Sequence, residues 1–382
     1  MNLPDGLGCT RRDAAGKLDP TGNRQNHIRA EPLRRALFEP HNRGAASPCL
    51  GGTMAGCRRN LHGRLIAFAM ALGAMSLTSG WVFYQDDRLP SHLAMVGTLA
   101  VELPEGRGAG TATLVDECGI LTNFHVVFGP WYVTALRSSS HDFVGTFTLT
   151  EVTLPDGTHP TARATPVVWG LYEGPDRQIR NPKEDWAYLV LDRCLGGEYG
   201  YLRLRSTDAD ELDAGNNGFA AVGYSTGRQM IDPSCSVHVD KTRADVWRHD
   251  CALLPGDSGG PILKRGTLTM NALASSFMSD SKECLRRGTT VGDVVPDWHD
   301  TCANIAVPLS SAVLDLVEAA HVAVGTQRLL ERLGYDAGPL GAIDDERATD
   351  AVRRVQHDVG WSVTGVPTDA LRKILILQLP TT

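Results

Sequence analysis

Short apolar runs separated by turn residues fill the middle of the chain, from Leu93 to Val307. Runs such as VGTLAVEL, GILTNFHVV and WAYLVLD are rich in β-branched and aromatic residues, and turn residues separate them at fairly regular spacing. This pattern is typical of an all-β sandwich or barrel, whereas regular alternation of strands with helices would indicate a parallel sheet. We therefore expect an all-β domain over this part of the chain.

The pattern changes to helical spacing after Pro308. The string SSAVLDLVEAAH places apolar residues three and four positions apart, and Ser310 or Ser311 can cap the helix that this spacing predicts. A second unit is predicted to begin at Gly325 and to form three short helices before Gln378. The chain should therefore end in a small all-α domain over residues 325–378.

Local signals place the three helices of this second unit. Gly334 ends the first helix, and the second lies within ERATDAVRRVQHDVGW. Thr368 can cap the third helix, and Asp369 then lies in its first turn, where a negative charge suits the helix dipole.

The first eighty residues differ from the rest of the chain. Residues 1–53 show no apolar periodicity and hold five prolines and seven glycines, so we expect them to be disordered. From Met54 to Gly80, a basic segment, an apolar run and small residues follow one another as in a secretory signal. Because a signal normally begins at the true N-terminus, we predict that translation starts at Met54 and that residues 1–53 are not made.

Two alternatives for this apolar run remain open. Leu65–Tyr84 is about long enough to span a bilayer as an uncleaved signal anchor, and a buried core helix is the other interpretation. Basic residues precede the run and acidic residues follow it, which favours an external position for the rest of the chain. The protein is therefore predicted to be secreted or periplasmic, or anchored in a membrane and facing outward.

Composition and charge exclude several classes of protein and one class of partner. The chain has 382 residues, of which 42% are hydrophobic and 21% charged, which argues against disordered, collagen-like and coiled-coil proteins. Residues 1–64 carry 11 basic and 5 acidic side chains, so the remainder, with 26 basic and 39 acidic, has a net charge of −13. An acidic body binds polyanions poorly, so we expect no nucleic-acid partner.

The number of cysteines is consistent with an exported protein. Of nine cysteines, six lie in the body of the chain and make an even set, which predicts three disulfides in an exported protein. There is no C-x-x-C pair and no histidine at zinc spacing from a cysteine pair, so we expect neither a metal site nor a cofactor. The six are Cys118, Cys194, Cys235, Cys251, Cys284 and Cys302.

One segment, LPGDSGGP over Leu254–Pro261, places Ser258 among glycines just before an apolar run. Glycines permit tight turns that expose a hydroxyl and aim successive backbone N–H groups at one point. Two such N–H groups stabilise a tetrahedral intermediate, and the loss of one typically costs about 3 kcal/mol. Ser258 is therefore a candidate nucleophile.

A serine hydroxyl needs a base, and the base needs a carboxylate that holds its tautomer. His125 in ILTNFHVV follows a predicted strand, and Asp185 opens DWAYLVL at the mouth of a buried strand. Each residue alone has an ordinary explanation, as a core histidine, a turn aspartate or a loop serine. Together, in this order and with these flanks, they predict nucleophilic catalysis by a triad.

The strings ILTNFHVV, DWAYLVL and LPGDSGGPIL resemble those of trypsin-like (chymotrypsin-fold) serine proteases, over roughly residues 87–323. The resemblance implies an all-β double β-barrel with the site between the barrels. It implies His125 as general base and acid, Asp185 as its orienting partner and Ser258 as nucleophile, with the backbone N–H groups of Gly256 and Ser258 as the oxyanion hole. The start of the domain is closer to bacterial glutamyl endopeptidase-like relatives than to digestive trypsins.

The same resemblance implies a substrate pocket. It places Ala252 at the pocket floor, where a trypsin has an aspartate, so no preference for basic residues is expected. Leu253 and Ala274 stand where glutamate-selective relatives carry polar residues, which disfavours glutamate and leaves a small or apolar side chain. Ser275 and its two successors fall where the family binds the substrate backbone as an added strand, with ordinary sheet packing as the alternative.

The predicted fold also implies a disulfide pairing. Cys118 precedes the histidine strand and Cys194 follows the aspartate strand, and these strands are neighbours in the family's first barrel. The resemblance thus implies bonds for the pairs Cys118–Cys194, Cys235–Cys251 and Cys284–Cys302.

The C-terminal unit has its own resemblance. Its layout, QRLLERLGYDAGP…AVRRVQ…VTG…ALRKIL, is similar to the peptidoglycan-binding domain of bacterial wall-active proteins. Peptidoglycan is therefore a candidate partner. A small helical bundle that packs on the protease or binds another protein is the alternative.

Two functions follow from these interpretations. The first is a secreted bacterial serine endopeptidase that hydrolyses protein or peptide substrates through an acyl-enzyme, with a cell-wall-targeting module. The second is a cell-wall-binding protein that carries a catalytically silent or latent protease fold.

Overall fold

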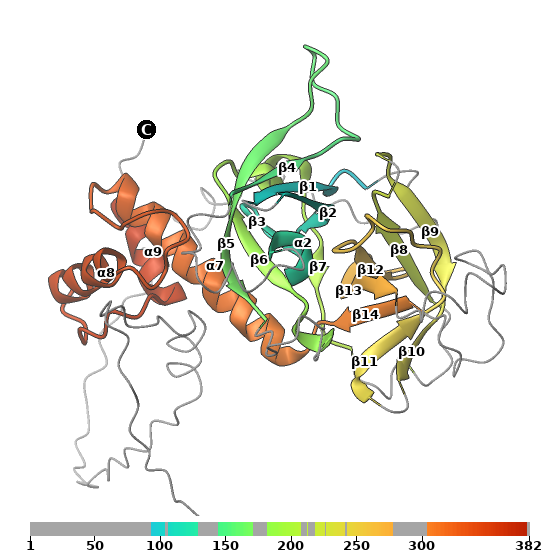
Figure 1. Ribbon diagram of the computed structural model, residues 1–382. Helices are drawn as coiled ribbons and strands as arrows, with labels where there is room; N and C mark the ends of the chain where they lie inside the picture. Colours follow the sequence, from blue (N-terminus) through green and yellow to red (C-terminus); the bar gives the residue numbers. More distant parts are fainter. Residues whose placement is uncertain are drawn as a thin grey trace, which may run out of the picture.

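The computed structural model describes most of the predicted β domain and the C-terminal helices (Figure 1). The described residues are 93–103, 106–128, 144–170, 182–207, 212, 218–225, 227–240, 243–277 and 304–379. Residues 1–53, the predicted signal at 54–80 and the cysteine pair Cys284–Cys302 lie outside these ranges. Within them, no helix has both the length and the apolar character required to span a bilayer.

Six antiparallel strands form a closed barrel in the order β1-β2-β3-β6-β5-β4. Buried residues alternate with exposed ones at the start of β5, and apolar side chains such as Leu99, Ile120, Phe147 and Leu189 fill the barrel. The strands are β1 (Val96–Leu103), β2 (Gly106–Leu114), β3 (Gly119–Thr122), β4 (Val144–Thr148), β5 (Thr161–Trp169) and β6 (Ala187–Leu191).

The second sheet has eight strands in the order β10-β11-β14-β13-β12-β8-β9, with β7 paired to β13. Its two end strands, β9 and β10, are joined by Ser236 alone, so the sheet must curl until these ends meet. The strands are β7 (Arg203–Leu204), β8 (Phe219–Gly223), β9 (Met230–Cys235), β10 (Val237–Asp240), β11 (Arg243–His249), β12 (Pro261–Lys264), β13 (Thr269–Phe277) and β14 (Asn304–Pro308). The chain thus has two β-barrels, as predicted. The first is closed by strand pairing, and the second is a curled sheet whose edge strands are connected through Ser236.

Two disulfides connect elements within these barrels. Cys118 of the β2–β3 turn bonds Cys194, which lies before the short helix α4 (Leu195–Tyr199). Cys235 at the end of β9 bonds Cys251, which follows β11. Both bonds are the ones that the sequence resemblance implied. They tie the strands that lead to His125 and to Ser258.

A single helix, α7 (Ser311–Arg332), joins the second barrel to the C-terminal helices. Its N-cap is Ser310, whose side chain accepts a hydrogen bond from the Val313 N–H. The sequence pattern predicted two helices divided near Gly325, but this glycine lies inside α7. An interior glycine costs only about 1 kcal/mol relative to alanine, so flanking helical residues can carry the helix through it.

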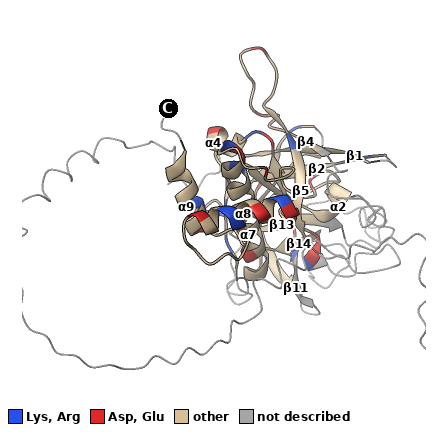
Figure 2. Cartoon of the chain, turned by 90° about the vertical axis from the view of Figure 1, so that its left-hand side faces the viewer, with Lys and Arg blue, Asp and Glu red and all other residues tan. Residues whose placement is uncertain are grey.

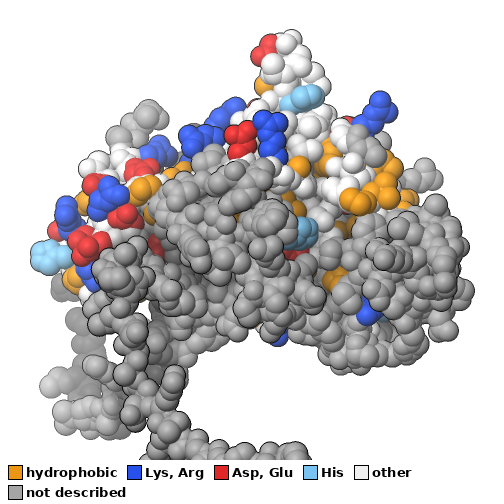
Figure 3. Space-filling view, viewed as in Figure 1, with side chains coloured by type: hydrophobic (Ala, Val, Ile, Leu, Met, Phe, Trp, Pro, Cys, Tyr) orange, Lys and Arg blue, Asp and Glu red, His pale blue; other side chains and the backbone are white. Residues whose placement is uncertain are grey.

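The C-terminal helices form a small module with its own core. The residues Leu330, Val352, Leu371 and Leu375 are buried together between the end of α7, α8 (Glu346–Asp358) and α9 (Asp369–Gln378). Thr368 caps α9 by accepting a hydrogen bond from Leu371, as the sequence predicted. Basic and acidic side chains are interspersed over α7, α8 and α9 (Figures 2 and 3). We call residues 325–378 the helical module.

The helical module packs on the outside of the first barrel, beside β5 and β6 (Figure 1). Val167 and Val190 of these strands belong to a buried apolar cluster, and Leu340 and Ile343 of the module pack against it. Gly341, with φ of +86°, lies so close to the barrel that an added Cβ would be 3.2 Å from Val190. The module is therefore docked on the barrel through apolar contacts.

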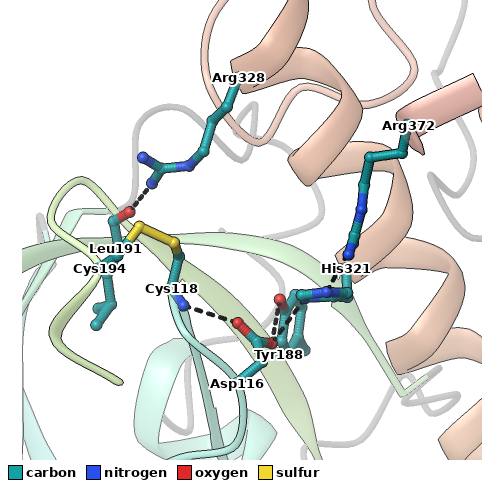
Figure 4. Close-up of a disulfide and its surroundings, with 8 residues drawn as sticks. All are labelled: Asp116, Cys118, Tyr188, Leu191, Cys194, His321, Arg328 and Arg372. Atoms are coloured by element: carbon teal, nitrogen blue, oxygen red, sulfur yellow. Dashed lines mark hydrogen bonds and ion pairs between the residues drawn. A yellow bond between two sulfur atoms is a disulfide. The ribbon is translucent and has the colours of Figure 1, made fainter. Parts of the chain in front are cut away.

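Polar contacts complete this junction (Figure 4). Asp116 of the β2–β3 turn accepts a hydrogen bond from the Tyr188 hydroxyl at 2.8 Å and lies 3.3 Å from Nδ1 of His321 on α7. Arg372 of α9 lies 2.9 Å from Nε2 of the same imidazole. Arg328 of α7 donates to the Leu191 carbonyl oxygen at the end of β6.

Candidate active site

His125 lies in the short helix α2 (Phe124–Phe128), one residue after β3 ends. The apolar residues on both sides of it are buried, whereas 29% of the His125 side chain is exposed. The strand-to-helix turn therefore holds the imidazole at the barrel surface, with its flanking residues fixed in the core.

Asp185 is fully buried just before β6, and its carboxylate accepts three hydrogen bonds. Its Oδ2 is 2.8 Å from His125 Nδ1 and accepts a bond from the Ser275 hydroxyl at 2.6 Å. Its Oδ1 accepts a bond from the His125 backbone N–H at 3.0 Å. The Asn123 side chain donates to the Asp185 carbonyl oxygen at 2.7 Å and fixes the backbone.

These contacts shift both pKa values. Burial raises the pKa of Asp185, but the charge and hydrogen bonds of His125 and the Ser275 hydroxyl more than offset it, so the pKa is lowered. Burial lowers the pKa of His125, and the charge and hydrogen bond of Asp185 more than offset that, so this pKa is raised. An ionised Asp185 can only accept, so Nδ1 of His125 carries the proton and Nε2 is left as the basic nitrogen.

Ser258 lies in the turn before β12, on the connection between β11 and β12 of the second sheet. Gly256 has φ of +107° and Gly259 has φ of +86°, which are conformations that favour glycine. The carbonyl oxygen of Ser258 accepts a bond from the Thr111 N–H of β2 at 2.8 Å, and the Thr111 hydroxyl donates to the Gly256 carbonyl oxygen at 3.0 Å. The first barrel thus holds the nucleophile loop of the second.

The Ser258 hydroxyl donates to the Ser275 carbonyl oxygen at 3.0 Å. Ser275 of β13 therefore contacts two of the three predicted triad residues, since its own hydroxyl bonds Asp185. His125 and Ser258 line one cavity, but no hydrogen bond joins them in this structure.

The backbone N–H groups around Ser258 divide into two sets. Those of Asp257, Gly259 and Gly260 donate to carbonyl oxygens of the protein, to Leu254, Ala274 and Asp257 respectively. Those of Gly256 and Ser258 have no hydrogen-bond partner among the described residues. These are the two donors that the sequence predicted for the oxyanion hole.

A cavity of about 300 Å³ opens beside Ser258 and His125. Ser275 lines it as predicted, but Ala252 does not: Ala252 is exposed, and its N–H donates to Asp232 at 2.7 Å. The cavity is lined by Ala109, His125, His249, Leu253, Leu254, Pro255, Gly256, Asp257, Ser258, Ala274, Ser275 and Asn304.

His249 and Asn304 are pocket residues that sequence reasoning missed. They face each other across the β11–β14 pair, in register, and both are buried. The sequence holds one signal for His249. It lies two positions after Trp247 in the same strand, so both side chains lie on the same face of the sheet, and Trp247 is buried. No group of three metal-binding side chains occurs in the part of the chain that the structure describes.

Comparisons with known proteins agree with this architecture. Residues 326–375 match the family described as "Putative peptidoglycan binding domain". No curated protein matches the chain. The chain therefore combines two β-barrels with a C-terminal helical module that matches this family over residues 326–375.

Several solved proteases are similar to this chain at low sequence identity. A thermostable serine protease from an extremophilic microorganism is 14% identical, with 60% of this chain and 98% of that chain covered and a TM-score of 0.42. A Glu endopeptidase is 16% identical, with 60% and 91% covered and a TM-score of 0.40. The serine endoprotease from Yersinia pestis is 13% identical, with 62% and 70% covered and a TM-score of 0.37.

Proposed function

We propose that this protein is an exported serine endopeptidase that hydrolyses peptide bonds through an acyl-enzyme on Ser258. The observation that carries the proposal is the pairing of buried Asp185 with His125 Nδ1 at 2.8 Å, on the wall of the cavity that also holds Ser258. This pairing leaves a basic Nε2 on a side chain that lines the cavity and is 29% exposed, and a nucleophilic serine requires such a base.

The first half of the reaction forms the acyl-enzyme. The Ser258 hydroxyl leaves the Ser275 carbonyl oxygen, turns toward His125 and attacks the substrate carbonyl carbon, while Nε2 takes its proton. The carbonyl oxygen becomes an oxyanion between the unpaired N–H groups of Gly256 and Ser258, each worth about 3 kcal/mol. His125 then gives the proton to the leaving amine, and the C–N bond breaks.

The second half returns the enzyme to its starting state. A water molecule attacks the ester carbonyl carbon while Nε2 takes one of its protons. The tetrahedral intermediate uses the same two N–H donors, and His125 returns the proton to the Ser258 oxygen as the acid product leaves. Proton transfer by a positioned histidine typically contributes about 10²–10⁴-fold to each step.

We place the protein outside the cytoplasm. The two disulfides, the predicted signal and the family match of the helical module support this location. The match also supports peptidoglycan as the surface that the module binds. Cosedimentation of the Ser258→Ala protein with insoluble peptidoglycan tests that binding, and deletion of residues 333–382 should abolish it.

Two observations favour a second candidate, a wall-binding protein with a latent protease fold. The Ser258 hydroxyl is bonded to Ser275 and not to His125, and Oδ1 of the buried Asp257 has no hydrogen-bond partner among the described residues. In a latent protease, this loop would have to rearrange before catalysis.

Labelling by a fluorophosphonate separates the two candidates. The full chain, made with its disulfides formed, should be labelled at Ser258, as located by mass spectrometry of peptides. Ser258→Ala should lose the label, and the exposed control Ser362→Ala should keep it. No label on folded protein would reject the active endopeptidase in favour of the latent one.

A further inference from the structure

The cavity beside Ser258 contains a buried polar group that the hydrolytic steps do not use. His249, the last residue of β11, is 1% exposed, and neither of its ring nitrogens has a hydrogen-bond partner among the described residues. Buried polar side chains are nearly always paired, because leaving one unpaired is unfavourable. An unpaired imidazole on a cavity wall therefore points to a ligand.

His249 is uncharged at neutral pH. Burial lowers its pKa to about 4, and the opposing effect of the nearby Ile305 backbone is smaller. A neutral imidazole offers one N–H donor and one acceptor.

Asn304 supplies a second polar group to the same cavity. Its Nδ2 donates to the Cys251 carbonyl oxygen at 3.0 Å, which orients the amide and leaves Oδ1 as an acceptor. Cys251 is itself held by its disulfide to Cys235, so this orientation is anchored to the covalent frame of the second barrel. The cavity thus pairs a donor on one strand with an acceptor on its neighbour.

The charges around the cavity do not favour an ionised side chain. No lysine or arginine lines it within the described ranges, so an acidic group would find no permanent cation. The carboxylate of Asp257 lies against Gly223 of β8, and its Oδ2 accepts a bond from the Leu254 N–H at 2.6 Å. Burial raises the pKa of Asp257, so a basic side chain would find only a carboxylate whose charged form is disfavoured. The remaining walls, such as Leu253 and Ala274, are apolar.

We infer that this cavity is the primary specificity pocket and selects a carboxamide side chain, glutamine or asparagine, with His249 donating to its oxygen and Asn304 accepting from its nitrogen. The inference rests on the proposed function and names the residue on the acyl side of the cleaved bond. This preference replaces the small or apolar side chain expected from the sequence, because an apolar group would leave the His249 ring and the Asn304 Oδ1 without a partner. A site built to hydrogen-bond its substrate strongly rejects analogues that lack the partner.

Fluorogenic peptides that differ only at this residue test the inference. Glutamine should exceed its near-isosteres glutamate and leucine by about 10²-fold in kcat/KM, and lysine by more. His249→Leu should reduce the preference for glutamine over leucine to within about threefold, whereas His249→Gln, which keeps a donor, should retain part of it. His357→Leu, on the exposed face of α8, is the matched control and should change nothing.

The rate of fluorophosphonate labelling separates a pocket effect from a loss of catalysis, because this probe does not need a side chain in the pocket. His249→Leu should be labelled within about twofold of the rate of the unaltered protein. A preference for leucine, alanine or glutamate by the unaltered protein would overturn the inference. A uniform loss with every peptide, or an equal loss of labelling, would also overturn it, because His249 would then be a structural residue.

Calorimetry on the Ser258→Ala protein measures the pocket without hydrolysis. Peptides that end in glutamine should bind at least tenfold more tightly than the same peptides ending in leucine, and equal affinities would overturn the inference. If the unaltered protein took no fluorophosphonate label, the proposed hydrolytic function would be rejected. The binding preference measured by calorimetry would still test the specificity of the pocket.

Discussion

The carboxylate of Asp185 holds His125 at two points, the ring Nδ1 at 2.8 Å and the backbone N–H at 3.0 Å. The two bonds use different oxygens, so both the ring orientation and the position of α2 depend on one buried residue. Ser275 adds a third bond from the second sheet, and the charged form of Asp185 is thereby favoured despite full burial. The tautomer of His125 follows from this arrangement.

Asp185→Asn is expected to lower kcat/KM by about 10⁴-fold with little change in fold. The asparagine amide can present an N–H to Nδ1, which puts the proton on Nε2, and Nε2 then cannot accept from Ser258. Peptide hydrolysis and fluorophosphonate labelling should fall together. Asp156→Asn, on an exposed turn, is the control and should be unchanged. A loss below tenfold in Asp185→Asn would contradict the role given to Asp185.

The pH dependence of kcat/KM should report His125. Its pKa is raised above 6.5, and only the neutral imidazole can take a proton, so activity should rise with pH along a limb centred above 6.5. Asp185→Asn removes the charge that raises this pKa and leaves burial, which lowers it. The limb of the residual activity should therefore move to lower pH. A limb that stays in place would show that Asp185 does not set the pKa.

The sequence predicted the triad because its flanks encode local structure. Glycines on both sides of Ser258 are needed for positive φ, and β-branched runs beside His125 and Asp185 are needed for buried strands. Runs of β-branched and aromatic residues between turns likewise predicted an all-β domain, and the cap at Thr368 predicted the start of α9. These signals act within a few residues, so they can be recognised without the fold.

The pocket and the helix boundary could not be predicted in this way. Asn304 follows Ser258 by more than forty residues and reaches the cavity only through the β11–β14 pairing. The resemblance implies that Ala252 forms the pocket floor, whereas Ala252 is exposed and its N–H donates to Asp232. Gly325 suggested a break, but the surrounding residues keep α7 helical and dock it on the first barrel. Tertiary contacts decide these positions.

Two glycines with similar backbone angles should differ in their tolerance of a side chain. Gly157→Ala, at φ of +81° with no atom near the new Cβ, should cost about 1–2 kcal/mol in the free energy of unfolding. Gly259→Ala, at φ of +86°, adds a clash with Thr122 and with the Thr111 backbone, which should bring the cost to about 4 kcal/mol. Chemical denaturation measures both, and equal costs would contradict the close approach of the barrels at Gly259.

The two disulfides should contribute unequally to stability. Cys118–Cys194 links residues 76 apart, and Cys235–Cys251 links residues only 16 apart. The longer link restricts the unfolded chain more, so its removal by paired serine substitutions should cost about 4.5 kcal/mol, against about 3 for the shorter link. Urea denaturation of the two double variants gives the comparison, and the reverse order would show that native-state contacts dominate.

The junction between α7 and the first barrel should weaken as pH rises. The hydrogen bond and charge of Asp116 raise the pKa of His321 above 6.5, while burial and Arg372 oppose the shift and Glu318 supports it. A pKa raised on folding contributes stability that is present below about 6.5 and lost as pH rises through the folded value. His321→Gln should therefore lower Tm more at pH 5.5 than at pH 8.5, as followed by differential scanning calorimetry. Ser362→Ala, at an exposed position after α8, is the control and should leave Tm unchanged at both pH values. If His321→Gln were more harmful at pH 8.5, the bond from Arg372 to the neutral ring would be the contact that holds the helical module in place.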